Sequence, residues 1–262
     1  GVMEKEIYEQ IIKKKEFSRL SQKDIEIAFN HFEKRQTTDE EKIRLTRELL
    51  HKVFGAFSSE KLLNKNILDK KSVEEILKKH ISTKERFEFY LELYNRILKD
   101  WKNKELNIID LGAGVNGLSY DFFPYKINYV GVEGIGQLVD LTNYYFFDRN
   151  IKNAKVIHLS LFELEKLKKI IKKQKGKKII FLFKVIDSLE MLERNYSKKL
   201  LKEIIDLPGV EKIVVSFATR SLISKKSFHV KRYWFENFIK EEFNLLENFE
   251  LGGEKYFIIK KK

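Results

Sequence analysis

From residue 106 onward, short apolar runs alternate with stretches of helical periodicity, and this alternation limits the folds open to the chain. The runs cover residues 106–111, 127–133, 154–159, 178–184 and 210–217. Strands that alternate with helices form a parallel sheet with helices on both faces. Two further runs, 243–251 and 255–259, flank Gly252 and Gly253, which predicts an antiparallel hairpin. We therefore expect an α/β fold whose parallel sheet ends in a hairpin.

The first hundred residues have a different pattern, which is helical throughout. Apolar residues recur at helical spacing in two places, Ile7, Ile11 and Ile12, then Ile25, Ala28, Phe29 and Phe32. Thr38, followed by three acidic residues, predicts a helix start. The run from Ser82 to Glu85 resembles a capping box for a helix through Tyr90 and Tyr94. We expect two domains, a helical one over 1–101 and an α/β one over 102–262.

A glycine-rich loop follows the first predicted strand. Gly112 and Gly114 allow a tight turn and a close approach of the backbone to a ligand. Glu133, at the end of the next strand, can accept hydrogen bonds from both ribose hydroxyls of an adenosine. Gly117 completes a glycine spacing that NAD-binding proteins share, so the loop fits NAD as well as S-adenosylmethionine. Asn116 can cap the following helix or touch the cofactor.

The order of elements along the whole chain favours one of the two cofactors. The glycine loop comes after about a hundred helical residues, and the chain closes with a hairpin. Both features favour the class I (Rossmann-like) S-adenosylmethionine methyltransferase fold, preceded by an all-helical domain. This inference is an analogy of fold.

Composition excludes several chemistries and suggests a partner. The chain has no cysteine, which excludes disulfides, thiolate metal sites and a Cys nucleophile such as C5 methylation of pyrimidines requires. Its five histidines lack ligand spacing, so we expect no metal. A net charge of +13 favours a polyanionic partner, although genome composition or heat adaptation can also give a Lys-rich chain. Mean hydropathy is −0.40, and we expect a soluble, cytoplasmic protein.

Guanine N7 is a target that suits this residue set. It carries a free lone pair and no proton, so its methylation needs no general base. The motif Asn/Asp-Pro-Pro-aromatic of many amino-group methylases is absent, because the only prolines are Pro124 and Pro208. We therefore expect no general base and assign no catalytic residue.

Three stretches carry a resemblance to a known family. Residues 80–86 read HISTKER, similar to that family's HASTKER, and residues 110–116 read DLGAGVN, similar to DIACGLN. Residues 215–222 read VSFATRSL, close to VSFPTRSL, and residues 50–57, LHKVFGAF, add weaker support. The chain resembles the aminoglycoside-resistance 16S rRNA (guanine-N7) methyltransferases from about residue 13 to residue 261.

The resemblance implies S-adenosylmethionine as the cofactor and a set of residues that bind it. Arg86 would reach the cofactor's carboxylate, and Glu133 would hold the ribose in place of the family's Asp. The full set implied for the cofactor is Arg86, Gly112, Gly114, Asn116, Glu133, Ser160, Leu161 and Phe183. Ser160 stands where the family has an Asp near the adenine. Without the resemblance, Arg86 is expected to pair with Glu88 or Glu92.

The resemblance also implies a target and a surface. The target is a guanine in the decoding-site helix, methylated in the assembled 30S subunit by a monomer, with drug resistance as the consequence. Residues near the base and RNA would be Lys184, Arg194, Arg220, Lys225, Phe228 and His229. The rRNA-docking surface would include Lys13, Lys14, Lys15, Arg19, Lys52, Lys70 and Lys71.

One stretch departs from the family. Residues 223–229 read ISKKSFH where the family tends to read GGRGKGM, so His229 stands at the family's Met, and Phe228 or His229 could stack on an extruded guanine. Two other functions therefore stay open. The enzyme could modify another rRNA or tRNA site, or the chain could be a non-catalytic RNA-binding or ribosome-assembly protein of the same fold.

Overall fold

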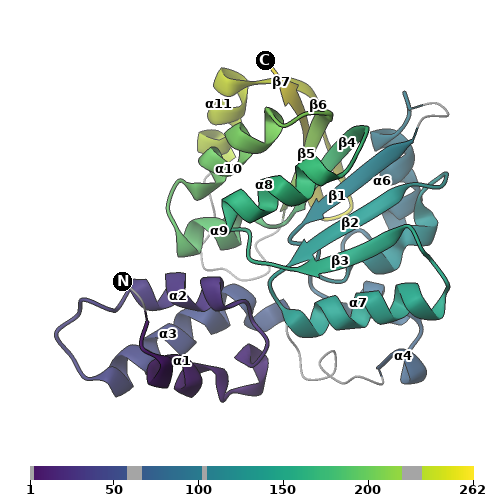
Figure 1. Ribbon diagram of the computed structural model, residues 1–262. Coiled ribbons are helices and arrows are strands. Elements are labelled where there is room, and N and C mark those ends of the chain that lie inside the picture. Colours follow the sequence, from purple (N-terminus) through teal and green to yellow (C-terminus); the bar gives the residue numbers. More distant parts are fainter. Residues whose placement is uncertain (1–2, 58–66, 102–104, 220–231) are drawn as a thin grey trace.

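A seven-stranded sheet forms the centre of the computed structural model, which describes residues 3–57, 67–101, 105–219 and 232–262 (Figure 1). The strand order is β3-β2-β1-β4-β5-β7-β6. The strands are β1 (Leu106–Leu111), β2 (Asn128–Glu133), β3 (Ala154–His158), β4 (Lys177–Phe183), β5 (Val210–Ala218), β6 (Phe243–Leu251) and β7 (Glu254–Lys261).

The pairing of the strands confirms the predicted parallel sheet and terminal hairpin. The strands from β3 to β5 pair in parallel, whereas β7 runs antiparallel to both β5 and β6. Every residue of β1 is buried, as expected for a strand covered on both faces. Predicted and observed strand ends differ by one or two residues at most. Gly252 adopts φ +57° in the hairpin turn, a conformation that glycine accepts without strain.

Helices cover the sheet on both faces. In Figure 1, α8 and α10 lie in front of the sheet and α6 lies behind it. The helices of this part are α6 (Tyr90–Ile97), η4 (Asn116–Phe122), α7 (Gly136–Asp148), α8 (Leu164–Lys173), α9 (Ile186–Leu192), α10 (Tyr196–Ile205) and α11 (Arg232–Glu242). The alternation of strands and helices predicted from the sequence is confirmed.

The N-terminal part is helical, as predicted. Its elements are α1 (Lys5–Ile12), η1 (Lys15–Phe17), α2 (Gln22–Asn30), α3 (Asp39–Phe54), η2 (Gly55–Phe57), α4 (Ile67–Lys70), α5 (Val73–Lys79) and η3 (Phe87–Phe89). The helix start at Thr38 is confirmed, because its hydroxyl accepts the Glu41 N–H at 3.2 Å. Among the described helices, none is long and apolar enough to cross a membrane.

The predicted capping box at residues 82–85 is wrong. The helix that contains Tyr90 and Tyr94 begins only at Tyr90, after the short helix η3. The Ser82 hydroxyl lies 2.5 Å from Nδ1 of His80, and the Glu85 carboxylate pairs with Lys184 at 2.7 Å. Both side chains therefore have stronger partners than the helix N-terminus.

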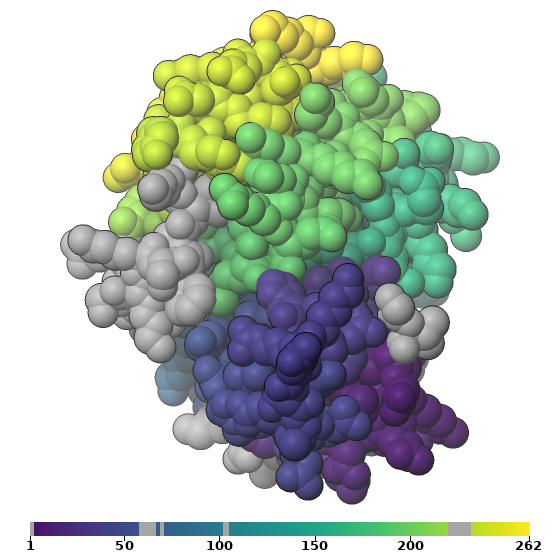
Figure 2. All heavy atoms as spheres, turned by 90° about the vertical axis from the view of Figure 1, so that its left-hand side faces the viewer, coloured from purple at the N-terminus to yellow at the C-terminus, as the bar shows by residue number. Residues whose placement is uncertain are grey.

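The backbone joins the helical part to the sheet at one segment. Ser21 N–H donates to Gly134 O at 2.8 Å, and Gly136 N–H donates to Arg19 O at 2.9 Å. Between them, Leu20 and Ile135 form an antiparallel bridge. A continuous apolar core extends from Met3 to Ile259, and Figure 2 shows the purple and blue N-terminal helices packed directly beneath the green helices of the sheet domain.

Gly117 packs η4 against α7 without room for a side chain. A Cβ atom at this position would lie 2.6 Å from Thr142 Cγ2 and 3.0 Å from Phe146 Cζ. We expect Gly117→Ala to lower the free energy of unfolding by about 1–3 kcal/mol, because the helices must separate. Urea denaturation measures this change. A denaturation midpoint equal to that of the wild type would contradict the packing argument.

Candidate functional site

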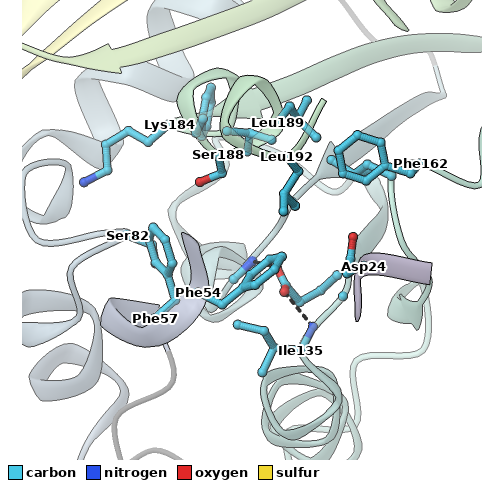
Figure 3. Close-up of a pocket in the computed structure, with 17 residues that line it drawn as sticks. Asp24, Phe54, Phe57, Ser82, Ile135, Phe162, Lys184, Ser188, Leu189 and Leu192 are labelled. Carbon is cyan, nitrogen blue, oxygen red and sulfur yellow. Dashed lines mark hydrogen bonds between the residues drawn. The ribbon is translucent and has the colours of Figure 1, made fainter. Parts of the chain in front are cut away.

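A cleft opens at the carboxyl ends of β1, β2 and β4, where the order of the sheet reverses and open α/β folds bind their ligands (Figure 3). Its inner space measures about 80 Å³, so a small-molecule ligand would also occupy the open mouth. Six residues expected from the sequence line it: Gly112, Gly114, Glu133, Leu161, Phe183 and Lys184. The cleft therefore gathers residues that are far apart in the sequence.

The loop after β1 turns tightly at the floor of the cleft. Gly112 and Gly114 adopt φ +70° and +52°, which other residues rarely accept. A Cβ atom on Gly112 would lie 2.6 Å from Val185 Cγ2. Gly114 N–H donates to Glu133 Oε1 at 2.8 Å, so the loop is braced on the acid of the next strand.

Glu133 presents a buried carboxylate to the cleft. Its Oε2 accepts the Ile135 N–H at 2.8 Å, the bond drawn in Figure 3. Burial raises the pKa of Glu133, while the backbone N–H groups of Ile135, Gly114 and Gly134 oppose this rise. Each carboxylate oxygen can accept a second hydrogen bond. Glu133 can therefore still receive two hydroxyls of a ligand.

One end of the cleft combines apolar side chains with a second carboxylate, Asp24 of α2. In Figure 3, Asp24 and Phe162 lie at this end, and Ser82 and Lys184 lie at the other. The Ser160 hydroxyl donates to Asp24 Oδ1 at 2.7 Å. Burial raises the pKa of Asp24 to about 7, although the Ser160 bond opposes the rise.

At the other end, Lys184 follows β4 in a left-handed conformation with φ 56°. Its N–H donates to Ser216 O at 3.0 Å, and its Nζ donates to Ile81 O and to Glu85 at 2.5 and 2.7 Å. Figure 3 shows the ammonium directed away from the cleft. Burial lowers the pKa of Lys184. Strained residues of this kind persist where the surrounding structure holds them, often at functional sites.

The Ser82 hydroxyl is oriented by a buried histidine. His80 Nε2 lies 3.0 Å from Phe57 O, so Nε2 carries the ring proton and donates to that carbonyl. Nδ1 is then unprotonated and accepts a hydrogen bond from the Ser82 hydroxyl, with Oγ at 2.5 Å. Burial lowers the pKa of His80 to about 4, which keeps the ring neutral near pH 7. The lone pairs of Ser82 Oγ remain as acceptors at the cleft.

Arg86 lies behind the wall of the cleft and does not line it. Its Nε donates to Glu254 Oε1 at 2.7 Å, its Nη1 donates to Asn116 Oδ1 at 2.8 Å, and its guanidinium carbon lies 4.7 Å from the centre of the Phe183 ring. Arg86 therefore pairs with Glu254 of β7, and not with Glu88 or Glu92, the partners expected without the resemblance. The coulombic attraction of Glu254 raises the pKa of Arg86 against the effect of burial.

Asn116 and Ser160 also lie behind the wall. Asn116 does not cap the following helix, because its Nδ2 donates to Asp110 Oδ2 at 2.9 Å. Ser160 is fully buried beneath Asp24. These two residues, like Arg86, orient groups that line the cleft or support its floor.

The remaining expected residues lie outside the cleft. Arg194 is exposed in the turn between α9 and α10. Four lie outside the described residues: Arg220, Lys225, Phe228 and His229.

The residues expected to dock on rRNA have different surroundings. Lys13, Lys14 and Lys15 are exposed. Arg19 pairs with Asp140, Lys52 pairs with Glu48, and Lys71 is half-buried. Lys70 ends α4, and its side chain lies outside the described part.

Several residues that line the cleft were not singled out from the sequence, namely Asp24, Phe54, Phe57, Ile135, Phe162, Ser188 and Leu189. Phe54 and Phe57 belong to the stretch at 50–57 that gave weaker support. Asp24 carried a signal, since it lies four residues before Ala28 on the buried face of α2. A charge on an apolar helix face marks a buried, functional or paired group.

Comparisons with solved structures identify the fold. The chain is similar to the 16S rRNA methylase RmtB, with TM-score 0.78, 20% identity and 98% of each chain covered. It is also similar to RmtF in complex with S-adenosyl-L-homocysteine (TM-score 0.78, 19% identity, 100% of each chain). An rRNA methylase from Escherichia coli has TM-score 0.76 and 20% identity over 98% of this chain and 99% of that one. No protein-family profile and no curated protein sequence matches the chain.

These likenesses show a shared fold over the whole chain, including the helical N-terminal part. The predicted class I methyltransferase fold with a terminal hairpin is confirmed.

The ion pair between Arg86 and Glu254 is buried on both sides, with exposed fractions of 2% and 0%. We expect Arg86→Met or Glu254→Leu to lower the free energy of unfolding by about 3–5 kcal/mol, because each leaves a buried charge unpaired. The double variant should recover most of the loss. Denaturant unfolding of the three variants measures this cycle.

Arg44→Met serves as the control, because Arg44 pairs with Glu41 and Glu48 on the exposed surface of α3, where loss of an ion pair should change the free energy of unfolding little. A double variant as unstable as the sum of the two single variants would contradict the ion-pair assignment.

Proposed function

We propose that this protein transfers a methyl group from S-adenosylmethionine to 16S rRNA. The observation that carries the proposal is the bond between Gly114 N–H and Glu133 at the point where the sheet reverses. This bond places a tight glycine loop beside a carboxylate suited to two ribose hydroxyls. The shared fold with rRNA methylases supports the same conclusion.

The cleft residues fit an adenosine carrying an amino acid. Glu133 would accept the ribose hydroxyls, and the apolar end at Ile135, Leu161 and Phe162 would receive the base. The glycine loop and Ser82 would face the amino-acid portion. Arg86 would then act from behind Phe183 as a positioning residue, because Glu254 already neutralises it.

When bound, the cofactor supplies a methyl group attached to a positively charged sulfur. The protein's own residues need only hold the two reactants in line, since guanine N7 has a lone pair and no proton to remove. Two side chains near the cleft that could move a proton are both held by other protein groups, as expected for a reaction without a general base. His80 is buried and neutral with Nδ1 engaged by Ser82, and the Lys184 ammonium is held by Ile81 and Glu85.

For the target, we propose guanine N7 in the decoding-site helix, methylated within the 30S subunit by a cytoplasmic monomer. The motifs at 80–86 and 215–222 support this choice. Arg194, Arg220, Lys225, Phe228 and His229 are the residues we assign to the base and its flanking RNA, and Lys184 would join them only if its ammonium left Ile81 and Glu85. A positive charge on the methylated guanine would repel cationic aminoglycosides, so resistance is the proposed consequence.

A second target is favoured by one observation. The segment at 223–229 reads ISKKSFH, which keeps basic charge but lacks the glycines and the Met of the family's pattern. Base contacts determine which nucleotide is accepted, while phosphate contacts set position. A methyltransferase of another rRNA or tRNA site is therefore the alternative.

Methyl transfer from labelled S-adenosylmethionine to intact 30S subunits, followed by mapping of the modified base, tests the reaction. We expect the label at N7 of a decoding-site guanine.

Glu133→Gln should weaken cofactor binding by about ten- to a hundredfold, because hydrogen bonds to a charged group are lost. Glu165→Gln, on the exposed side of α8, is the matched control. Label on another RNA would select the alternative target, and cofactor binding without transfer would overturn the enzymatic proposal.

The cluster Lys13, Lys14 and Lys15, all exposed, is the part of the proposed docking surface most open to test. We expect a triple Lys→Gln variant to bind 30S subunits more weakly and with a salt dependence less steep by about one unit per lost phosphate contact. Cofactor affinity should stay unchanged. Equilibrium binding to 30S at several salt concentrations measures both effects. An unchanged 30S affinity would remove these lysines from the docking surface.

A further inference from the structure

We propose that Asp24, a residue of the helical N-terminal part, recognises the 6-amino group of the cofactor's adenine. The proposal rests on the proposed function, because it assumes an adenosine cofactor in the cleft. It assigns a further cofactor-binding side chain to the helical part, which already contributes Ser82 at the other end of the cleft. The sheet domain alone would therefore hold an incomplete site.

The backbone places Asp24 over the segment that follows Glu133. Ser21 N–H donates to Gly134 O at 2.8 Å, which fixes the start of α2 against this segment. A Cβ atom on Gly134 would lie 2.5 Å from Asp24 Oδ2, so only glycine allows the carboxylate to come this close. Asp24 is thus held beside the residue we assign to the ribose.

The two oxygens of Asp24 have different surroundings. Oδ1 accepts the Ser160 hydroxyl at 2.7 Å, and Ser160 Oγ in turn accepts the Phe162 N–H at 3.1 Å. For Oδ2, the described residues provide no hydrogen-bond donor, although Asp24 is only 4% exposed and lines the cleft. Oδ2 is therefore open to the cleft, where it can accept a hydrogen bond from a ligand.

Adenine offers the required donor at the required end. With the ribose on Glu133, the base would lie toward Phe162, and Figure 3 shows Asp24 at that same end of the cleft. The 6-amino group donates two hydrogen bonds, whereas the 6-oxo group of hypoxanthine or guanine only accepts. A carboxylate at this place therefore favours adenine and rejects 6-oxo purines.

The protonation state of Asp24 should then control affinity. Its ionisable neighbours are Glu133 after β2, Glu163 before α8 and Tyr196 of α10, and His158 of β3 lies against the Gly134 carbonyl at 2.9 Å. Burial raises the pKa of Asp24 to about 7, and the protonated acid is a much weaker acceptor for the amino group than the ionised carboxylate. Affinity should therefore fall about tenfold from pH 8 to pH 6, and this fall should vanish in Asp24→Asn.

Calorimetric binding of two thioethers to the full chain tests the proposal. One is S-adenosyl-L-homocysteine, and the other is S-inosyl-L-homocysteine, which carries hypoxanthine in place of adenine. We expect the wild type to prefer the adenine compound by about ten- to a hundredfold. Asp24→Ala and Asp24→Asn should reduce this preference below about fivefold. Glu26→Gln, on the same helix and bonded to Gln22, should keep it.

The outcomes separate the two proposals. Wild-type protein that binds neither thioether would overturn the proposed function and this inference together. Wild-type protein that binds the adenine compound, with the preference intact in Asp24→Ala, would overturn the inference alone. Thermal unfolding of each variant verifies that it is folded before binding is compared. A tenfold pH effect that persists in Asp24→Asn would assign the titration to a neighbour and also overturn the inference.

Discussion

The buried guanidinium of Arg86 is the interaction on which the two halves of the structure depend. It joins the end of the helical part to Glu254 of the terminal hairpin and, through Asn116, to Asp110 of β1. Ions buried to this degree are tolerated only when they are paired and hydrogen-bonded. Displacement of the hairpin or of the helical segment would therefore leave a buried charge unpaired behind the wall of the cleft.

The cleft is consequently a joint product of both halves. The sheet contributes the glycine loop and Glu133, whose positions follow from strand ends and a tight turn. The helical part contributes Asp24, Phe54 and Phe57. The lysines at 13–15, proposed for docking on RNA, belong to the same helical part, so the proposed substrate surface and the proposed cofactor cleft share one part of the chain. Linkage between them then requires no separate regulatory element.

The sheet could be predicted because its strands and turns follow from residues that are close together in the sequence. Part of the site could not, because its side chains have partners that are far away in the sequence. Strands, hairpin and glycine loop depend on neighbours in the chain, and their ends were predicted within one or two residues. Arg86 and Glu254 are 168 residues apart, and Asp24 and Ser160 are 136 apart. No spacing in the sequence reveals such pairs. The capping box at 82–85 failed partly for the same reason, since Glu85 pairs with Lys184, 99 residues away.

The turn at residues 80–86 connects these observations. His80 orients Ser82 at the cleft, Glu85 holds the ammonium of Lys184, and Arg86 reaches the hairpin. Lys184 is strained at φ 56° because its N–H reaches Ser216 while its side chain turns back to this turn. Any displacement of the helical segment would move Ser82 and also break the ion pair between Glu85 and Lys184. The segment HISTKER thus connects the helical part to the cleft through three side chains, and these contacts account for Arg86 without any direct contact between Arg86 and a ligand.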